Sequence, residues 1–273
     1  MKHQLTTKYF PGINLKLNLQ KHRTALLFIS IFSLTGFMLP SSMALAAAGS
    51  SVSATSGTSG STSSALTATQ QKQHLTNIQT KGVTEINRRL NSLGTVLTKI
   101  SSVTKLSSGD QTTLKGEVNT EISGLTTLKA QLETDTTLSS AIADAQSIIS
   151  EYRVYALVLP KTWLVSLADS QQVTEGKLTT LAQNLQTRIT ADQQAGKTVT
   201  SLQTQLNDMT TQITNAQAIS SNMEQTVIVL QPADYNSDQA LLSGDLAKLK
   251  TATSDNQAAY KDAKSIISSL ESL

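Results

Sequence analysis

Apolar residues recur at helical spacing through most of this chain of 273 residues. Over residues 83–100 they are separated by alternating steps of three and four, which places one apolar stripe along an α-helix and is typical of coiled-coil-like packing. Helical spacing recurs over residues 114–132, 145–167, 178–189, 199–230 and 242–270, and the stretch between residues 168 and 177 is mostly polar. The pattern therefore predicts an all-α protein with five long helices.

Short breaks separate the predicted helices, which makes consecutive helices antiparallel neighbours. Residues 104–108 interrupt the first two helices, and a third begins near Thr136. Gly196 is a good residue for a helix end, and Pro232 ends the fourth helix. The fifth helix is expected from about Asn236 onward.

The third predicted helix, over residues 138–195, is the longest and contains Pro160 in an apolar run. Its apolar positions continue through the proline to Trp163 and Leu167. An interior proline removes one backbone hydrogen bond and bends a helix, whereas the residue before a proline favours a helix end, here at Leu159. The unbroken apolar spacing favours a kinked helix near Pro160.

Two predicted helices precede this central helix and two follow it. The simplest packing is an elongated antiparallel bundle made of two three-helix bundles, residues 65–159 and 160–273, which share the central helix as in spectrin-like rods. The alternative is a central helix broken near Pro160 or Gly176, with a six-helix bundle folded back on itself.

Residues 1–46 have the pattern of a signal peptide: basic residues without acidic ones, an apolar run over residues 25–39, and small residues at Ala44 and Ala46. The rival interpretation is an uncleaved membrane anchor. Both interpretations predict a secreted or cell-surface location for the rest of the chain. Residues 47–64, rich in Ser, Thr and Gly, are predicted to be a flexible linker.

The charge balance changes once the leader is removed. The whole chain has 22 Lys and Arg against 19 Asp and Glu. Five of the basic residues lie in residues 1–46, so 17 basic residues face 19 acidic ones in the remainder, a net charge of −2. The composition thus gives no reason to expect a nucleic-acid partner, and it allows membrane contact only through an uncleaved leader.

Residue types needed for catalysis are scarce. The sequence has no Cys, and His74 is the only His beyond the leader, which excludes a multi-His zinc site. Glu117 and Glu121 lie one helical turn apart, and we interpret them as part of a solvated helix face. The chain is predicted not to be an enzyme and to need no cofactor.

Aromatic residues gather around the proline of the central helix. Tyr152, Tyr155 and the single Trp163 lie there. One interpretation is packing in the helix seam where the kink opens it. The other is an aromatic groove for a small apolar or glycan ligand, with Arg153 and Lys161 at its rim.

An incomplete calcium-loop pattern follows the fourth helix. Asp234, Asn236, Asp238 and Asp245 have the spacing of several ligands in such a loop. Gln239 stands where the loop needs Gly for its sharp turn. We therefore expect no metal, with these four residues as the one calcium candidate.

The string YRVYALVLP, residues 152–160, lies in an exported helical chain rich in Thr, Gln and Ala. In these respects the chain resembles a group of uncharacterised secreted or envelope proteins of small-genome candidate-phyla bacteria. The resemblance implies an exported all-helical protein, and the group has no assigned activity or functional residues. The sequence thus predicts a non-enzymatic exported helical-bundle protein of the envelope or extracellular space, with a structural, adhesive or protein-interaction role through a protein partner or self-association. The alternative is a ligand-binding protein at the aromatic residues.

Overall fold

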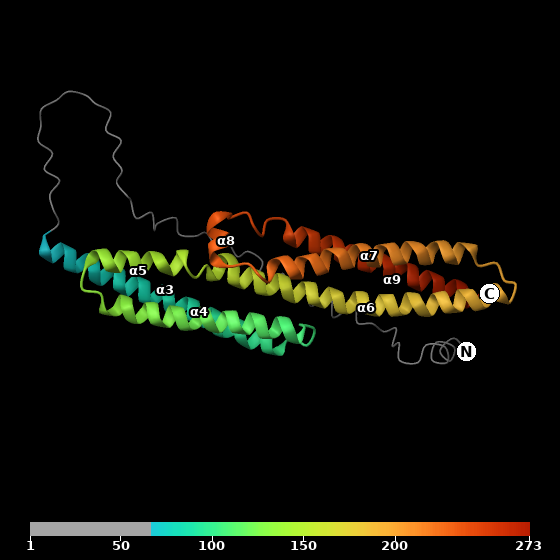
Figure 1. The fold of residues 1–273 in the computed structure, drawn as a ribbon, viewed down its shortest axis with the longest axis horizontal. Coiled ribbons are helices and arrows are strands. Elements are labelled where there is room, and N and C mark those ends of the chain that lie inside the picture. Colours follow the sequence, from blue (N-terminus) through green and yellow to red (C-terminus); the bar gives the residue numbers. More distant parts are fainter. Residues whose placement is uncertain (1–66) are drawn as a thin grey trace, which may run out of the picture. The chain divides into compact units, whose positions relative to one another are not determined.

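The computed structural model describes residues 67–273, which contain helices, turns and connections but no strand. Their long helices are α3 (Ala68–Ser102), α4 (Ser108–Thr134), α5 (Leu138–Ser150), α6 (Leu159–Gln194), α7 (Thr200–Val227) and α9 (Asp245–Leu270) (Figure 1). A short helix α8 (Pro232–Ser237) and a π-helical turn η1 (Val154–Val158) complete the set. The all-α prediction is confirmed.

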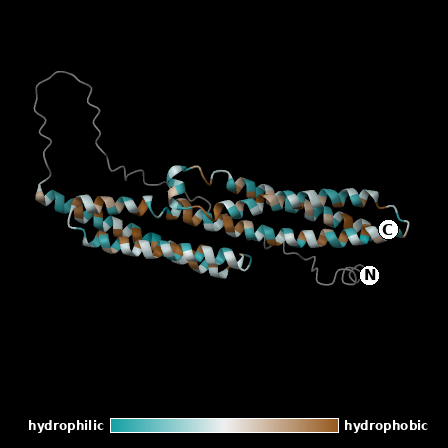
Figure 2. Cartoon of the chain, in the orientation of Figure 1, coloured by the Kyte–Doolittle hydropathy of each residue, from teal (hydrophilic) through white to brown (hydrophobic). Residues whose placement is uncertain are grey.

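The helices pack antiparallel and in two sets. Helix α3 packs against α4 and α5, which we name the first helix group, and α6 packs against α7 and α9, the second helix group (Figure 1). Apolar residues form stripes along these helices (Figure 2). One buried apolar cluster runs from α3 through η1 to α9, and Ala65–Leu273 form one compact unit. None of the described helices is long and apolar enough to cross a membrane.

Local capping explains where several helices begin. The hydroxyls of Thr67, Ser107 and Thr137 accept hydrogen bonds from the backbone N–H three residues later, at 3.3, 3.0 and 3.2 Å. Such caps satisfy N–H groups that have no partner inside the helix. Gly196 follows the end of α6 with φ 81°, a conformation that favours glycine. These boundaries agree with the predicted breaks.

The last long helix begins later than the sequence predicts. It starts at Asp245, after Gly244 with φ 82°, whereas Asn236 lies in the separate helix α8. The carboxylate of Asp238 accepts a hydrogen bond from the backbone N–H of Ala240 at 2.9 Å. This local side-chain bond competes with helix formation and accounts for the turns between α8 and α9.

Helices α5 and α6 and the turn η1 form a central helical segment of 57 residues. Its irregularity lies ahead of Pro160, at Arg153, whose φ is 36°. Pro160 itself lies in the first turn of α6, where its missing N–H has no helical partner to lose. The helix continues through Gly176, the other position where a break was considered.

Around Pro160 the buried face of the central segment differs from the apolar stripe read in the sequence. Lys161, Leu164 and Ala168 are buried, whereas Ile149 and Trp163 are 46% and 36% exposed. The predicted apolar stripe was misplaced because hydropathy does not count Lys161 as apolar, although this lysine occupies a core position. The interruption at Arg153 also breaks the helical register, so the buried face of α6 cannot be extrapolated from the apolar positions of α5.

Gly124 of α4 is where the ring of Tyr152 approaches the helix. A Cβ atom at Gly124 would lie 2.6 Å from Tyr152 Cε1, whereas a Cβ at Gly116 of the same helix would have nothing within 4 Å. We expect Gly124→Ala to lower the free energy of unfolding by about 1–3 kcal/mol through overpacking. Gly116→Ala is the matched control and should stabilise by up to about 1 kcal/mol through helix propensity. Urea denaturation of both variants measures this, and equal effects would contradict the close contact.

Candidate functional site at the junction of the helix groups

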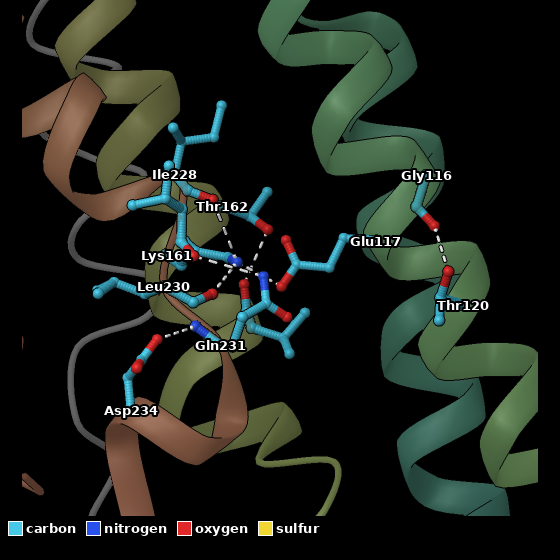
Figure 3. A network of polar contacts seen from close by, with 11 residues as sticks. Gly116, Glu117, Thr120, Lys161, Thr162, Ile228, Leu230, Gln231 and Asp234 are labelled. Carbon is cyan, nitrogen blue, oxygen red and sulfur yellow. Dashed lines mark hydrogen bonds and ion pairs between the residues drawn. The ribbon is translucent and has the colours of Figure 1, made fainter. Parts of the chain in front are cut away.

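Lys161, in the first turns of α6, connects the two helix groups. Its side chain is fully buried. The ammonium group pairs with the carboxylate of Glu117 in α4 and donates hydrogen bonds to the carbonyl oxygens of Leu230 at 2.6 Å and Ile228 at 3.4 Å (Figure 3). These carbonyls follow the end of α7, where a cation is favoured by the helix dipole. All three N–H donors of Lys161 are thus committed to holding α4, α6 and α7 together.

Glu117 and Glu121 are not a solvated helix face. Glu121 is buried, and its Oε2 atom has no hydrogen-bond partner. Burial and the nearby Glu117 raise the pKa of Glu121 to about 7, against the opposing charge of Lys161. Burial also raises the pKa of Glu117, although its bond to Lys161 acts in the opposite direction. The sequence correctly showed that the two residues lie one helical turn apart. It did not predict their burial, because that burial depends on α6.

Asp169 forms a second connection between the groups. This α6 carboxylate accepts a hydrogen bond of 2.6 Å from the backbone N–H of Ser107, just before α4. Next to it, Lys105 Nζ donates to Ser170 Oγ at 3.3 Å. Burial raises the pKa of Asp169 to about 6, the bond from Ser107 opposes this, and Asp110 adds to it. The α3–α4 connection is therefore fastened to α6 by polar contacts.

The aromatic residues of the central segment have different surroundings. Tyr152 packs on Gly124 of α4. The hydroxyl of Tyr155 lies 3.0 Å from Ser92 Oγ in α3, and the guanidinium of Arg88 lies 4.5 Å from the centre of its ring. The two tyrosines thus contact the first helix group on separate helices. Lys161, expected at the rim of an aromatic groove, is instead a core residue.

Trp163 is more exposed than Tyr152 and Tyr155, which are partly buried, and it is the only Trp in the sequence. We expect its fluorescence to be quenched by iodide in the folded protein, because over a third of the residue's surface is accessible to solvent. Stern–Volmer titration measures this, with the unfolded chain as the reference for full access. Complete protection from iodide would contradict the exposed position. An emission shift on adding glycans or apolar ligands would favour the ligand-binding alternative.

A buried polar layer crosses the second helix group. Glu175 of α6 is fully buried and accepts hydrogen bonds from Ser220 Oγ of α7 at 2.7 Å and Asn256 Nδ2 of α9 at 3.2 Å. Burial raises the pKa of Glu175, and these two bonds oppose the shift. Beside it, Gln171 Nε2 donates to Thr253 Oγ1 at 2.9 Å. Such a layer favours one alignment of the three helices, because a shifted helix would leave the carboxylate unpaired.

The four residues of the calcium candidate have other partners. Asp234 and Asp238 accept backbone N–H bonds of 2.8 and 2.9 Å that close local turns, and Asp245 pairs with Lys248 at 2.9 Å. Asn236 bonds to the central segment. In the part of the chain that the structure describes, no three His, Cys, Asp or Glu side chains are grouped to hold a metal ion.

Comparisons with protein-family models, with curated proteins and with solved structures found no match to this chain. The fold and the junction by themselves define an all-α protein of antiparallel helices with a 57-residue central helix. In its junction, Lys161 and Asp169 of α6 are bonded to groups outside α6, to Glu117 and to the backbone of Ser107.

Proposed function

We propose that this chain is a non-enzymatic, exported helical-bundle protein of the cell envelope or extracellular space, with a structural, adhesive or protein-interaction role. The observation that carries the proposal is that buried Lys161 and Asp169 bond to groups outside their own helix and so hold helices together. Lys161 and Asp169, both on α6, bind the first helix group through Glu117 and Ser107. A chain organised in this way serves as a spacer that holds its surfaces apart.

The arrangement that we propose is two three-helix bundles, residues 65–159 and 160–273, sharing the central segment as in spectrin-like rods. It is supported by the packing of α3 with α4 and α5, and of α6 with α7 and α9. If the 57 residues continue in one direction, the segment spans about 86 Å at 1.5 Å per residue.

The proposal of export rests on the sequence of the leader alone. Residues 1–46 and the linker over residues 47–64 lie outside the residues that the structure describes. The leader has the charge and apolar pattern of a signal peptide. The remaining chain has a net charge of −2. We propose a protein partner or a second copy of this chain as the binding partner, since that charge favours neither nucleic acid nor an anionic membrane surface.

Two measurements test the proposal. The full chain, expressed in a bacterial host with a C-terminal tag, should leave the cytoplasm, and its intact mass should lack residues 1–46. Full-length protein retained in the cytoplasm would contradict export. Small-angle scattering of residues 47–273 should then give a maximum dimension of at least about 86 Å; a value well under about 70 Å would contradict the shared central helix.

Sedimentation velocity over a wide concentration range separates the two classes of partner. A mass that rises with concentration supports self-association. A constant monomer mass means that a structural or adhesive role needs a different protein, which cross-linking on cells would identify.

A further inference from the structure

The backbone of Arg153 interrupts the central segment in an unusual way. Its φ and ψ are 36° and 32°, and it is the one residue other than glycine with positive φ in residues 67–273. The left-handed conformation is unfavourable for a residue with a Cβ atom. Something outside the local sequence must therefore hold Arg153 in it.

Pro160 explains the π-helical turn but not the conformation of Arg153. Because proline has no N–H, a regular α-helix would leave the carbonyl of Ala156 without its donor. In η1 the N–H groups of Val158 and Leu159 instead reach back five residues, to the carbonyls of Arg153 and Val154. Nothing in this accommodation requires a left-handed residue seven positions before the proline.

A single side chain of α8 bonds both to the residue that ends α5 and to Arg153 itself. Asn236 Nδ2 donates to the carbonyl of Ser150, the last residue of α5, at 2.8 Å. Arg153 Nε donates to Asn236 Oδ1 at 2.6 Å, and the Arg153 guanidinium lies 5.5 Å from the centre of the Tyr235 ring. In a continuous helix the Ser150 carbonyl would accept from the N–H of Val154. Asn236 therefore takes the bond that the continuous helix would use.

We propose that residues 151–153 form a hinge in the central segment and that Asn236 acts as a latch. Its two hydrogen bonds keep the helix interrupted at this hinge. Releasing the latch lets α5 continue into η1 and changes the distance between α5 and α6. The latch is reversible because both Asn236 bonds are exposed to solvent, where water competes for the same groups. This device goes beyond the spacer role and does not depend on it: it gives the central segment two lengths.

Double electron–electron resonance tests the latch on the full chain. The sequence has no Cys, so Gln146→Cys in α5 and Thr180→Cys in α6, both at exposed positions, carry the only spin labels. We expect one narrow distance distribution in the parent protein and a second population in Asn236→Ala. Ser237→Ala is the matched control, because the Ser237 hydroxyl bonds only within α8, to Ala233; it should match the parent.

Two further variants keep the test decisive. Arg153→Gly removes the strain of the left-handed residue, so it should retain the parent distance. Asn236→Asp keeps an oxygen for Arg153 but has no N–H for Ser150, so it should show the second population even if Asn236→Ala does not fold. Distance distributions that are the same in folded Asn236→Asp, folded Asn236→Ala and the parent would overturn the proposal.

Discussion

Replacing Lys161 with methionine is expected to lower the free energy of unfolding by about 3–5 kcal/mol, the cost of leaving a buried charge without its partner. Glu117 remains with only 13% of its side chain exposed, and the carbonyls of Leu230 and Ile228 lose their donor. Methionine keeps most of the lysine volume, so the loss reports on the polar contacts. Urea denaturation followed by circular dichroism measures it.

The double variant Lys161→Met/Glu117→Leu is the control for this loss. Removing both charges should restore at least half of the stability, because a buried ion pair replaced by apolar residues of similar volume is often neutral or stabilising. The double-mutant cycle then gives the coupling energy of the pair. A loss under about 1 kcal/mol in the single variant would show that Lys161 reaches solvent.

The free energy of unfolding is expected to rise as the pH falls from about 8 to 5. The pKa of Glu121 is raised from 4.5 to about 7 in the folded protein. A group with a raised pKa contributes stability that is fully present below its unfolded pKa and is lost as the pH rises through the folded pKa. The difference between the two values corresponds to about 3 kcal/mol. Asp169, raised from 3.8 to about 6, acts in the same direction.

The variant Glu121→Gln isolates the contribution of this carboxylate to the pH dependence of the free energy of unfolding. The amide cannot ionise, so the variant should be more stable than the parent at pH 8 and its stability should depend less on pH. Glu133→Gln is the matched control on the same helix, since Glu133 is exposed, with 51% of its side chain accessible. Unfolding curves at several pH values measure both variants. A pH profile of Glu121→Gln that equals the parent profile would contradict a buried, titrating Glu121.

The helices α3 and α4 could be predicted from the sequence because their buried positions are mostly aliphatic. In α3 the apolar spacing correctly selects Ile86, Leu93 and Ile100, all of which are buried. Here the local pattern and the tertiary packing agree, so the face of each helix can be read directly.

The same reasoning misplaced the buried face of the central segment around Pro160, whereas the apolar positions over residues 178–189 are buried as predicted. Lys161, Gln171 and Glu175 are polar, yet all three are buried in α6. Each has partners from segments at least 44 residues away, such as Glu117 for Lys161 and Asn256 for Glu175. A hydropathy pattern cannot identify such positions, because a polar group is tolerated in a core only when a distant group bonds to it.

The sequence by itself determined the helical class, the order of the long helices and most of the breaks between them, because helical periodicity and turn residues act over a few residues of chain. Only the tertiary structure decided which charges are buried, that the Glu117–Lys161 pair lies in the junction, and that the central segment is interrupted at Arg153. Those features depend on α4, α7 and α8 meeting α6 and η1. The physical reason is that burial of a charge and a left-handed arginine both need partners that the neighbouring sequence does not supply.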